Sequence, residues 1–442
     1  MGKSAGKFRR IAIFGHFDGT NLGNEATLEA FLFNLRRIQP EAEVTCICTG
    51  PKITAAAYHI RAIPIARTYV KSWAPRNRVA KAARTFFVAM TEPIRWLECV
   101  ANLWGADILI VPGTGLLTDA YDLMGWGPYS LFKWSVTAKV CRCRLAIISV
   151  GAGPFFSSIG KFCVRSLLSL ADFRSYRDES TVHHLQGIGF PAGRDRVLPD
   201  LAFSLPRNAI SPRDGRMGAG AVIGLGVMEH AGRYSKLSPG DPAHTTYLQA
   251  LAETAKWLLA RGYNIRLLIG DFADAPAKQT FLQLLGQNGA SFDRNRIIDE
   301  PIHSVEDLLS QIAATDAVVA TRFHNILLAL FCEKPVISIS FHHKCDSLMM
   351  AMGMSDYCVN IADLEPAKLI ETFCRLEVNS DALSSLIKQR NEGFRNALDQ
   401  QYQLIFNGMQ RGLGTISAKG FITERIHEPL GDQQPQARQA RR

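Results

Sequence analysis

The stretch Asp316-Ala-Val-Val-Ala-Thr-Arg-Phe-His324 is an apolar run followed at once by an arginine and a histidine. The apolar run predicts a buried strand, and the apolar segment from Asn325 to Cys332 predicts a helix. A helix N-terminus presents unpaired backbone N–H groups and a partial positive charge. Arg322 and His324 therefore predict an anion site, suited to a phosphate or a carboxylate, at the carboxyl end of a strand.

Similar apolar runs recur along most of the chain and alternate with segments of helical periodicity. The predicted strands are residues 10–14, 44–48, 107–111, 145–150 and 173–176 in the first half, and 222–226, 265–269, 317–320 and 336–340 in the second. This alternation is typical of βα units around parallel sheets. We therefore predict an α/β fold with two Rossmann-like domains.

The length of 442 residues also favours two domains of roughly 200 residues each. We expect residues 1–205 to form the N-terminal domain and residues 221–365 the C-terminal domain. A linker is predicted at 206–220, where proline, glycine and arginine are frequent and apolar residues show no periodicity. Residues 366–412 have apolar positions at helical spacing and are expected to pack back against the first domain. Residues 413–442 are expected to be a flexible basic tail.

The composition, with 47% hydrophobic and 20% charged residues, is that of a soluble globular protein. The longest uncharged run, residues 145–160, is broken by glycine and proline and is too short to span a membrane. The N-terminal residues lack the pattern of a secretory signal. The ten cysteines contain no CxxC pair, which favours reduced thiols. We therefore expect a cytoplasmic protein.

The net charge of +10 predicts an anionic partner. The basic and aromatic residues do not form the pattern of a nucleic-acid module, so an anionic substrate or membrane surface explains the charge better. An expected insertion, residues 71–104, mixes Trp73, Trp96 and Trp104 with basic residues. Such a helix either lies in a membrane interface or covers the core with its tryptophans packed inward, and the sequence leaves both interpretations open.

Three glycine turns, at residues 15–25, 112–115 and 151–154, each follow a predicted strand of the first half. Glycine allows a backbone to approach a ligand closely, so we predict that the turns form one wall of a cleft. None matches a dinucleotide or Walker motif, so neither NAD nor ATP is inferred. Helix capping is a competing interpretation for Asn21. The candidate binding residues are Asn21, Gly23, Glu25, Gly113, Gly115, Gly151 and Gly153.

Two more cations follow predicted strands. Arg177 precedes Asp178 and Glu179, and it is either a structural salt-bridge partner of these acids or a second anion clamp across the cleft from Arg322. Lys344 follows a pair of histidines after the strand at 336–340. No carboxylate at ligand spacing accompanies that pair, so no metal site is predicted.

Seven blocks together resemble the polysaccharide pyruvyl transferase family, although none is specific alone. In family order they are Asn21-Leu-Gly-Asn-Glu-Ala, Pro112-Gly-Thr-Gly-Leu-Leu, Ser149-Val-Gly-Ala-Gly-Pro, Tyr176-Arg-Asp-Glu-Ser, Pro199-Asp-Leu-Ala-Phe, Thr321-Arg-Phe-His and residues 334–344. The resemblance implies a fold similar to GT-B glycosyltransferases, with the acceptor on the N-terminal domain and phosphoenolpyruvate, the donor substrate, held in the interdomain cleft by the C-terminal one. No other cofactor is implied.

The resemblance also implies that Arg322, His324 and Arg177 act on the donor. Ketal formation adds two sugar hydroxyls to C2 of phosphoenolpyruvate, protonates C3 and expels phosphate. We expect the arginines to hold the anionic groups and His324, as an imidazolium, to protonate C3. The family usually has Asp where this chain has Asn24, so no acid role is assigned there. The candidates for the base are Asp18, Glu25, Asp119 and Asp200.

The sequence thus predicts a pyruvyl transferase acting on a surface polysaccharide or its lipid-linked precursor, at the inner face of the plasma membrane. Residues 71–104 would then contact the membrane. One alternative is a nucleotide-sugar-dependent glycosyltransferase of related fold, with Glu300 or Glu306 binding a ribose. Another is a non-catalytic scaffold.

Overall fold

The computed structural model describes residues 8–69, 77–120, 122–207, 217–229, 242–286 and 293–408. Several predicted features fall wholly or partly outside these described residues. They are most of the expected linker, the beginning of the insertion with Trp73, and the expected tail at 413–442.

In the described part of the chain, the first domain is built on a parallel sheet with the strand order β3-β2-β1-β4-β5-β6-β7. Its strands are β1 (Arg10–Gly15), β2 (Glu43–Cys48), β3 (Arg61–Pro64), β4 (Ile108–Pro112), β5 (Arg144–Val150), β6 (Phe173–Tyr176) and β7 (Arg196–Val197). The central strands β4 and β5 are mostly apolar and buried, except for Arg144 at the start of β5, because helices cover both faces of the sheet.

The second domain is built on a parallel sheet with the order β10-β9-β8-β11-β12-β13. Its strands are β8 (Val222–Gly226), β9 (Asn264–Leu268), β10 (Ile297–Ile298), β11 (Ala317–Ala320), β12 (Val336–Ser340) and β13 (Cys358–Asn360). The two parallel sheets with interleaved helices confirm the predicted α/β fold of two Rossmann-like domains.

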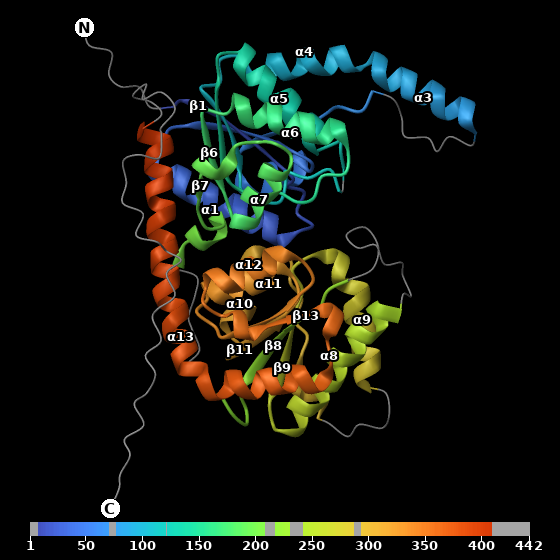
Figure 1. Cartoon of the computed structure of the whole chain (residues 1–442), viewed down its shortest axis with the longest axis vertical. Helices are drawn as coiled ribbons and strands as arrows, with labels where there is room; N and C mark the ends of the chain where they lie inside the picture. Colours follow the sequence, from blue (N-terminus) through green and yellow to red (C-terminus); the bar gives the residue numbers. More distant parts are fainter. Residues whose placement is uncertain are drawn as a thin grey trace, which may run out of the picture.

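Helices surround each sheet, and the two domains stack along the long axis of the molecule (Figure 1). Those of the first domain are α1 (Leu22–Ile38), α2 (Pro51–Tyr58), α3 (Arg78–Met90), α4 (Glu92–Leu103), α5 (Pro128–Val140), α6 (Ser158–Leu170) and α7 (Glu179–Gly187), with short helices η1 (Ala192–Arg194) and η2 (Leu201–Ser204). Those of the second are α8 (Pro242–Ala260), α9 (Ala275–Gly286), α10 (Val305–Ala313), α11 (Phe323–Phe331) and α12 (His343–Ala351), with η4 (Phe272–Asp274), η5 (Arg294–Arg296), η6 (Ser355–Tyr357) and η7 (Ile361–Asp363).

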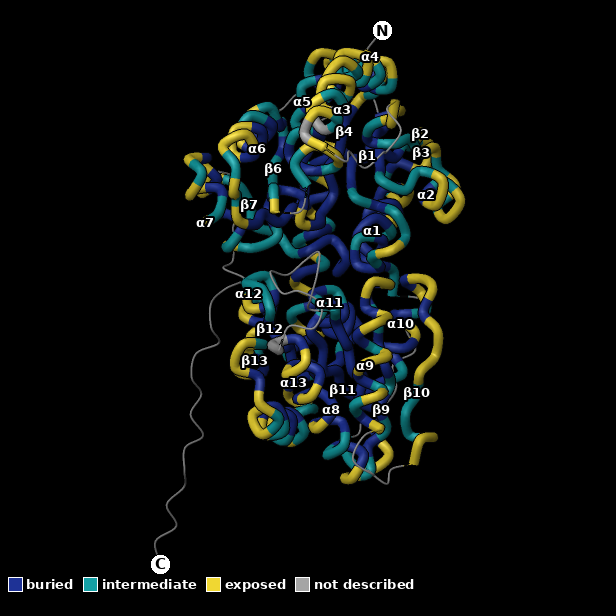
Figure 2. Tube along the Cα trace, turned by 90° about the vertical axis from the view of Figure 1, so that its right-hand side faces the viewer, coloured by how far each residue is buried: buried dark blue, intermediate teal, exposed yellow. Residues whose placement is uncertain are grey.

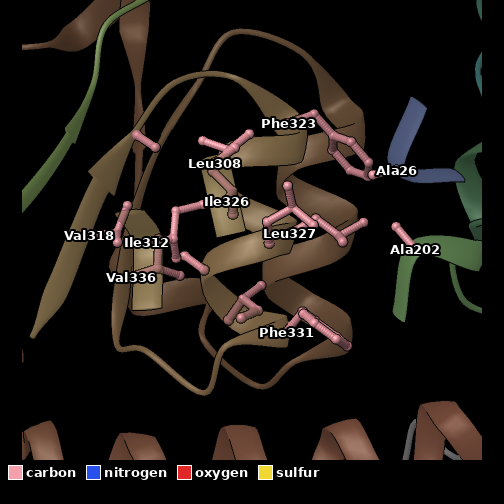
Figure 3. Packing of buried hydrophobic residues seen from close by; sticks show 14 of the residues in the cluster. Ala26, Ala202, Leu308, Ile312, Val318, Phe323, Ile326, Leu327, Phe331 and Val336 are labelled. Atoms are coloured by element: carbon pink, nitrogen blue, oxygen red, sulfur yellow. The ribbon is translucent and has the colours of Figure 1, made fainter. Parts of the chain in front are cut away.

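One apolar cluster continues from the first domain into the second. It joins α1 and η2 of the first domain to the buried face of α11. Figure 3 shows Phe323 and Leu327 of α11 pointing towards Ala26 and Ala202 of the first domain. An apolar contact of this kind holds two domains in a defined relation, which positions the side chains between them.

The helix α13 (Pro366–Gln403), extended by a π-helical turn at Leu404–Gly408, runs along both domains (Figure 1). Its Phe373 packs edge-on against Tyr263 of the second domain, with the ring centroids 5.4 Å apart. Near its other end, Gln401 Nε2 donates to Ser149 Oγ of the first domain at 3.1 Å. The helix therefore links the two domains over its whole length.

Candidate active site between the two domains

His324 lies in the first turn of α11, directly after β11, and its imidazole packs against the first turn of α1 in the other domain. A Cβ atom at Gly23 would lie only 1.8 Å from the Nδ1 atom of His324. The close approach therefore requires glycine at position 23. The structure brings together two residues that the sequence predicts as site members in different domains.

His324 is buried, and three cationic side chains lie near it. Burial lowers its pKa to about 4; Asp200 acts to raise it, and the neighbouring Arg177, Lys344 and Arg322 lower it further. Among the described residues, its Nε2 atom is buried without a hydrogen-bond partner. This low pKa favours a neutral imidazole at pH 7 in the absence of a bound anion. An anion bound among these cations would raise this pKa.

Arg177 follows β6 and points into the domain interface. Its Nη1 lies 3.2 Å from Asp200 Oδ2, and its Nε lies 3.4 Å from Asp178 Oδ2. Its guanidinium also lies 4.6 Å from the ring centroid of Phe323 in the second domain. A Cβ at Gly151 would come within 2.5 Å of Nη2, so this glycine leaves room for the guanidinium. The predicted salt bridge to Asp178 is thus present, while the guanidinium still faces the other domain.

Lys344, in the first turn of α12, approaches the same ring from the second domain, with its Nζ 5.4 Å from the Phe323 centroid. Burial lowers its pKa to about 8. No carboxylate of the described residues lies within 4.0 Å of its ammonium group. Arg177, Asp200, Phe323 and Lys344 line a cavity between the domains. Two cations from different domains therefore meet at one cavity.

Arg322 has a buried partner that the sequence does not reveal. Its Nε and Nη2 atoms lie 2.8 and 2.5 Å from the two carboxylate oxygens of Asp274, whose side chain is fully buried. Asp274 also accepts from the backbone N–H of Glu229 at 2.9 Å. The paired carboxylate fixes the direction of the Arg322 fork. The only sequence signal for Asp274 is that it follows the strand β9.

Asn21 carries out the competing role of a helix cap. Its Oδ1 accepts from the backbone N–H groups of Gly23 and Asn24, each at 3.1 Å. Its Nδ2 donates to Asp271 of the second domain at 2.8 Å. Asn21 therefore orders the start of α1 and ties it to the other domain.

The other glycine turns lie together at the carboxyl ends of β4 and β5. The backbone N–H of Gly151 donates to Thr114 at 2.8 Å, and that of Gly153 donates to Leu117 at 3.0 Å. Gly113 and Thr114 both have positive φ angles, 53° and 57°. The Thr114 hydroxyl is buried without a partner among the described residues. Gly115 is exposed and borders open space.

The four residues predicted as candidates for the general base have different environments in the structure. Glu25 accepts from Tyr58 Oη at 2.8 Å and from the backbone of Gly19, and burial raises its pKa. Asp18 accepts from the backbone N–H of Thr20 in its own loop, and Asp119 accepts from the backbone N–H groups of Phe156 and Ser157, which lie just before α6. Asp200 alone among the four lines the interdomain cavity.

Comparison with known proteins relates this geometry to one family and one fold. A sequence model of the family described as polysaccharide pyruvyl transferase matches residues 21–343. No curated protein sequence matches the chain.

Solved structures share the fold at low sequence identity. S. aureus MnaA with UDP is 11% identical, with a TM-score of 0.56 over 92% of this chain and 97% of that one. Anabaena HepE with UDP and glucose is 13% identical, with a TM-score of 0.55 over 92% and 100%. The UDP-GlcNAc 2-epimerase of Neisseria meningitidis bound to UDP-GlcNAc is 12% identical, with a TM-score of 0.53 over 91% and 100%. These similarities confirm the predicted GT-B-like arrangement.

Proposed function

The chain belongs to the polysaccharide pyruvyl transferase family, an enzyme family, and from this we propose that it transfers pyruvate from phosphoenolpyruvate to a saccharide as a ketal. The observation that carries the proposal is the meeting of Arg177 and Lys344, from different domains, at one buried ring. Phosphoenolpyruvate carries a carboxylate and a phosphate, which two separate cations suit. His324 and Arg322 stand at the same helix N-terminus.

In the proposed reaction, two hydroxyls of one sugar form bonds to C2 of phosphoenolpyruvate. The bond from C2 to the phosphate oxygen breaks, C3 gains a proton to become a methyl group, and phosphate leaves with the second hydroxyl proton. We assign the proton transfer at C3 to His324, because the bound anion would raise its pKa towards neutrality. Asp200 is the proposed base, since it lies in the cavity beside Arg177.

The acceptor side is proposed to be the wall formed by the turns at 113–115 and 151–153. Thr114 supplies a buried hydroxyl there, with no partner among the described residues, and such a group suits a sugar hydroxyl. We propose a surface polysaccharide or its lipid-linked precursor as the acceptor, and the cytoplasmic face of the membrane as the place of reaction. Across the described residues, no helix has the length and apolar character needed to cross a bilayer.

A test of the proposal supplies the protein with phosphoenolpyruvate and a panel of lipid-linked oligosaccharides. We expect phosphate release that depends on the acceptor, and a product heavier by one pyruvate ketal in mass spectrometry. If calorimetry detects no binding of phosphoenolpyruvate, phosphoenolpyruvate is not the donor substrate. A product formed without phosphate release would contradict the ketal mechanism.

Lys344 gives donor binding a specific pH dependence. Since its pKa is about 8 in the free protein and a bound anion favours the charged ammonium, affinity should fall as the pH rises through 8. The expected loss is about tenfold per pH unit above that value. Lys344→Arg keeps its charge throughout. The dissociation constant for phosphoenolpyruvate is measured by calorimetry for the parent and for Lys344→Arg between pH 7 and 9.5. We expect the ratio of the parent's constant to the variant's to rise with pH; a constant ratio would exclude Lys344 from the donor site.

A nucleotide-sugar-dependent glycosyltransferase is the second candidate, because the similar MnaA and HepE structures contain UDP. The two acids proposed for ribose binding do not favour it. Glu300 forms an ion pair with Arg266, and Glu306 is exposed in the first turn of α10. Neither lines the cavity between the domains. Sugar transfer from a UDP-sugar in the same acceptor assay would establish this candidate instead.

A further inference from the structure

The helices α3 and α4 carry an exposed apolar stripe. They follow one another with only Thr91 between them and lie at the end of the first domain that faces away from the second (Figure 1). Along one side they present large apolar residues at helical spacing, with exposed fractions between 48% and 78%. These are Val79, Phe86, Phe87, Met90, Ile94 and Leu97, together with Trp104 directly after α4. Figure 2 shows the described residues of α3 as largely exposed and α4 as a mixture of exposed and intermediate residues.

The opposite side of α4 is firmly attached to the domain. Cys99 and Leu103 are buried in the core. Glu92 accepts from Lys133 Nζ at 2.7 Å and from Tyr129 Oη at 2.9 Å, both on α5. These contacts set the rotation of α4 about its axis. The apolar stripe is therefore held outward by the fold.

The sequence leaves open whether the large apolar side chains of the insertion pack into the core or face outward, and the exposure of the stripe bears on this. Of the tryptophans in the insertion, Trp96 is half-buried, Trp104 is 71% exposed, and Trp73 lies outside the described residues. A cover helix would bury its large apolar side chains against the domain. In the described part of the insertion, α3 and the outer side of α4 do the opposite, which marks an interaction surface.

The charge of the sequence before α4 favours an anionic partner. From Tyr69 to Thr91 the sequence contains five lysines and arginines and neither aspartate nor glutamate. A second copy of the chain docked on the stripe would bring two such basic segments together and repel. A lipid bilayer with anionic headgroups over an apolar acyl-chain layer complements both the positive charge and the apolar side chains of this part of the chain.

We propose that the α3–α4 stripe binds the surface of an anionic lipid bilayer, with the two helices lying in the plane of the interface. Phe86, Phe87 and Met90 enter the boundary between headgroups and acyl chains, and the net positive charge of the sequence before α4 attracts anionic lipid. The inference does not depend on the donor or acceptor, because it concerns a surface remote from the cavity. It does place the enzyme where a lipid-linked acceptor is found.

The test is flotation of the full-length protein with phosphatidylcholine vesicles, with and without phosphatidylserine, in the absence of any substrate. We expect binding to the anionic vesicles that weakens as salt is added. The variant Phe86→Glu/Phe87→Glu/Met90→Glu should lower the partition coefficient by at least about tenfold. Val378→Glu on α13 is the matched control, since Val378 is 84% exposed but lies outside the stripe; it should bind as the parent does.

Two results would overturn the proposal: the parent protein fails to float with anionic vesicles, or the triple variant floats as well as the parent. If the parent does not float and forms a dimer that the triple variant loses, the stripe binds a second copy of the chain instead. Sedimentation velocity at several concentrations detects the dimer. Circular dichroism of the triple variant shows that the substitutions, all at exposed positions, leave the fold intact.

Discussion

Replacing His324 with glutamine is expected to lower kcat for phosphate release by about 10²–10⁴-fold, the usual range for loss of a positioned general acid. Glutamine preserves much of the volume and polarity but cannot deliver a proton. The measurement is phosphate release at saturating phosphoenolpyruvate and acceptor. His303→Gln is the control, because His303 is exposed before α10 and lies outside the cavity. A His324→Gln enzyme with kcat near the parent value would remove His324 from the mechanism.

Gly23→Ala tests the same imidazole from the other domain. The new methyl group would overlap His324, so the ring must move or the domains must separate. Gly23→Ala should therefore lower kcat in an enzyme that has His324, but cause little further loss of kcat in a His324→Ala enzyme. Equal losses in both backgrounds would show that Gly23 acts independently of the histidine. Gly393→Ala on α13, where a Cβ meets no atom within 4 Å, controls for the effect of glycine replacement in a helix.

The second large effect concerns the buried ion pair of Asp274 and Arg322. Asp274→Ala leaves a guanidinium without its main counter-charge in a buried place, so we expect a loss of about 3–5 kcal/mol in the free energy of unfolding. Burial raises the pKa of Asp274, although the neighbouring Arg322 acts to lower it. Urea denaturation followed by circular dichroism measures the change.

An exposed pair provides the comparison. Arg37 and Asp399 lie 2.5 Å apart, with side chains 46% and 51% exposed. Asp399→Ala should therefore cost no more than about 1 kcal/mol. The double variant Asp274→Ala/Arg322→Met should be more stable than Asp274→Ala alone, since no buried charge remains unpaired. If Asp274→Ala costs no more than Asp399→Ala, the pair is not the structural anchor described above.

The sequence predicts the central strands well because burial on both faces makes them continuous apolar runs. All nine predicted strands are present within one residue of their expected bounds. The edge strands β3, β7, β10 and β13 are missed. They have two to four residues each, and half-exposed strands such as Arg196–Val197 show no apolar run.

The site is predicted in part. The motif around Arg322 and His324 can be found from strand and helix signals, which are local. The contacts that define their chemistry are between distant parts of the chain, as with Asp274 on Arg322 and Gly23 on His324. Such contacts depend on how the domains pack, and no local pattern encodes them. The lowered pKa of His324 follows from the same burial and could not be predicted either.

The course of α13 bears on the order in which the protein folds during synthesis. Phe31, in α1 of the first domain, packs against Tyr402 and Phe406, with ring centroids 6.3 Å apart in each case. These partners leave the ribosome only after the whole second domain. Domains usually fold one after another as they emerge, but here the first to be made is the last to be completed. Until residues 402–406 dock, Phe31 of the first domain lacks these two aromatic partners.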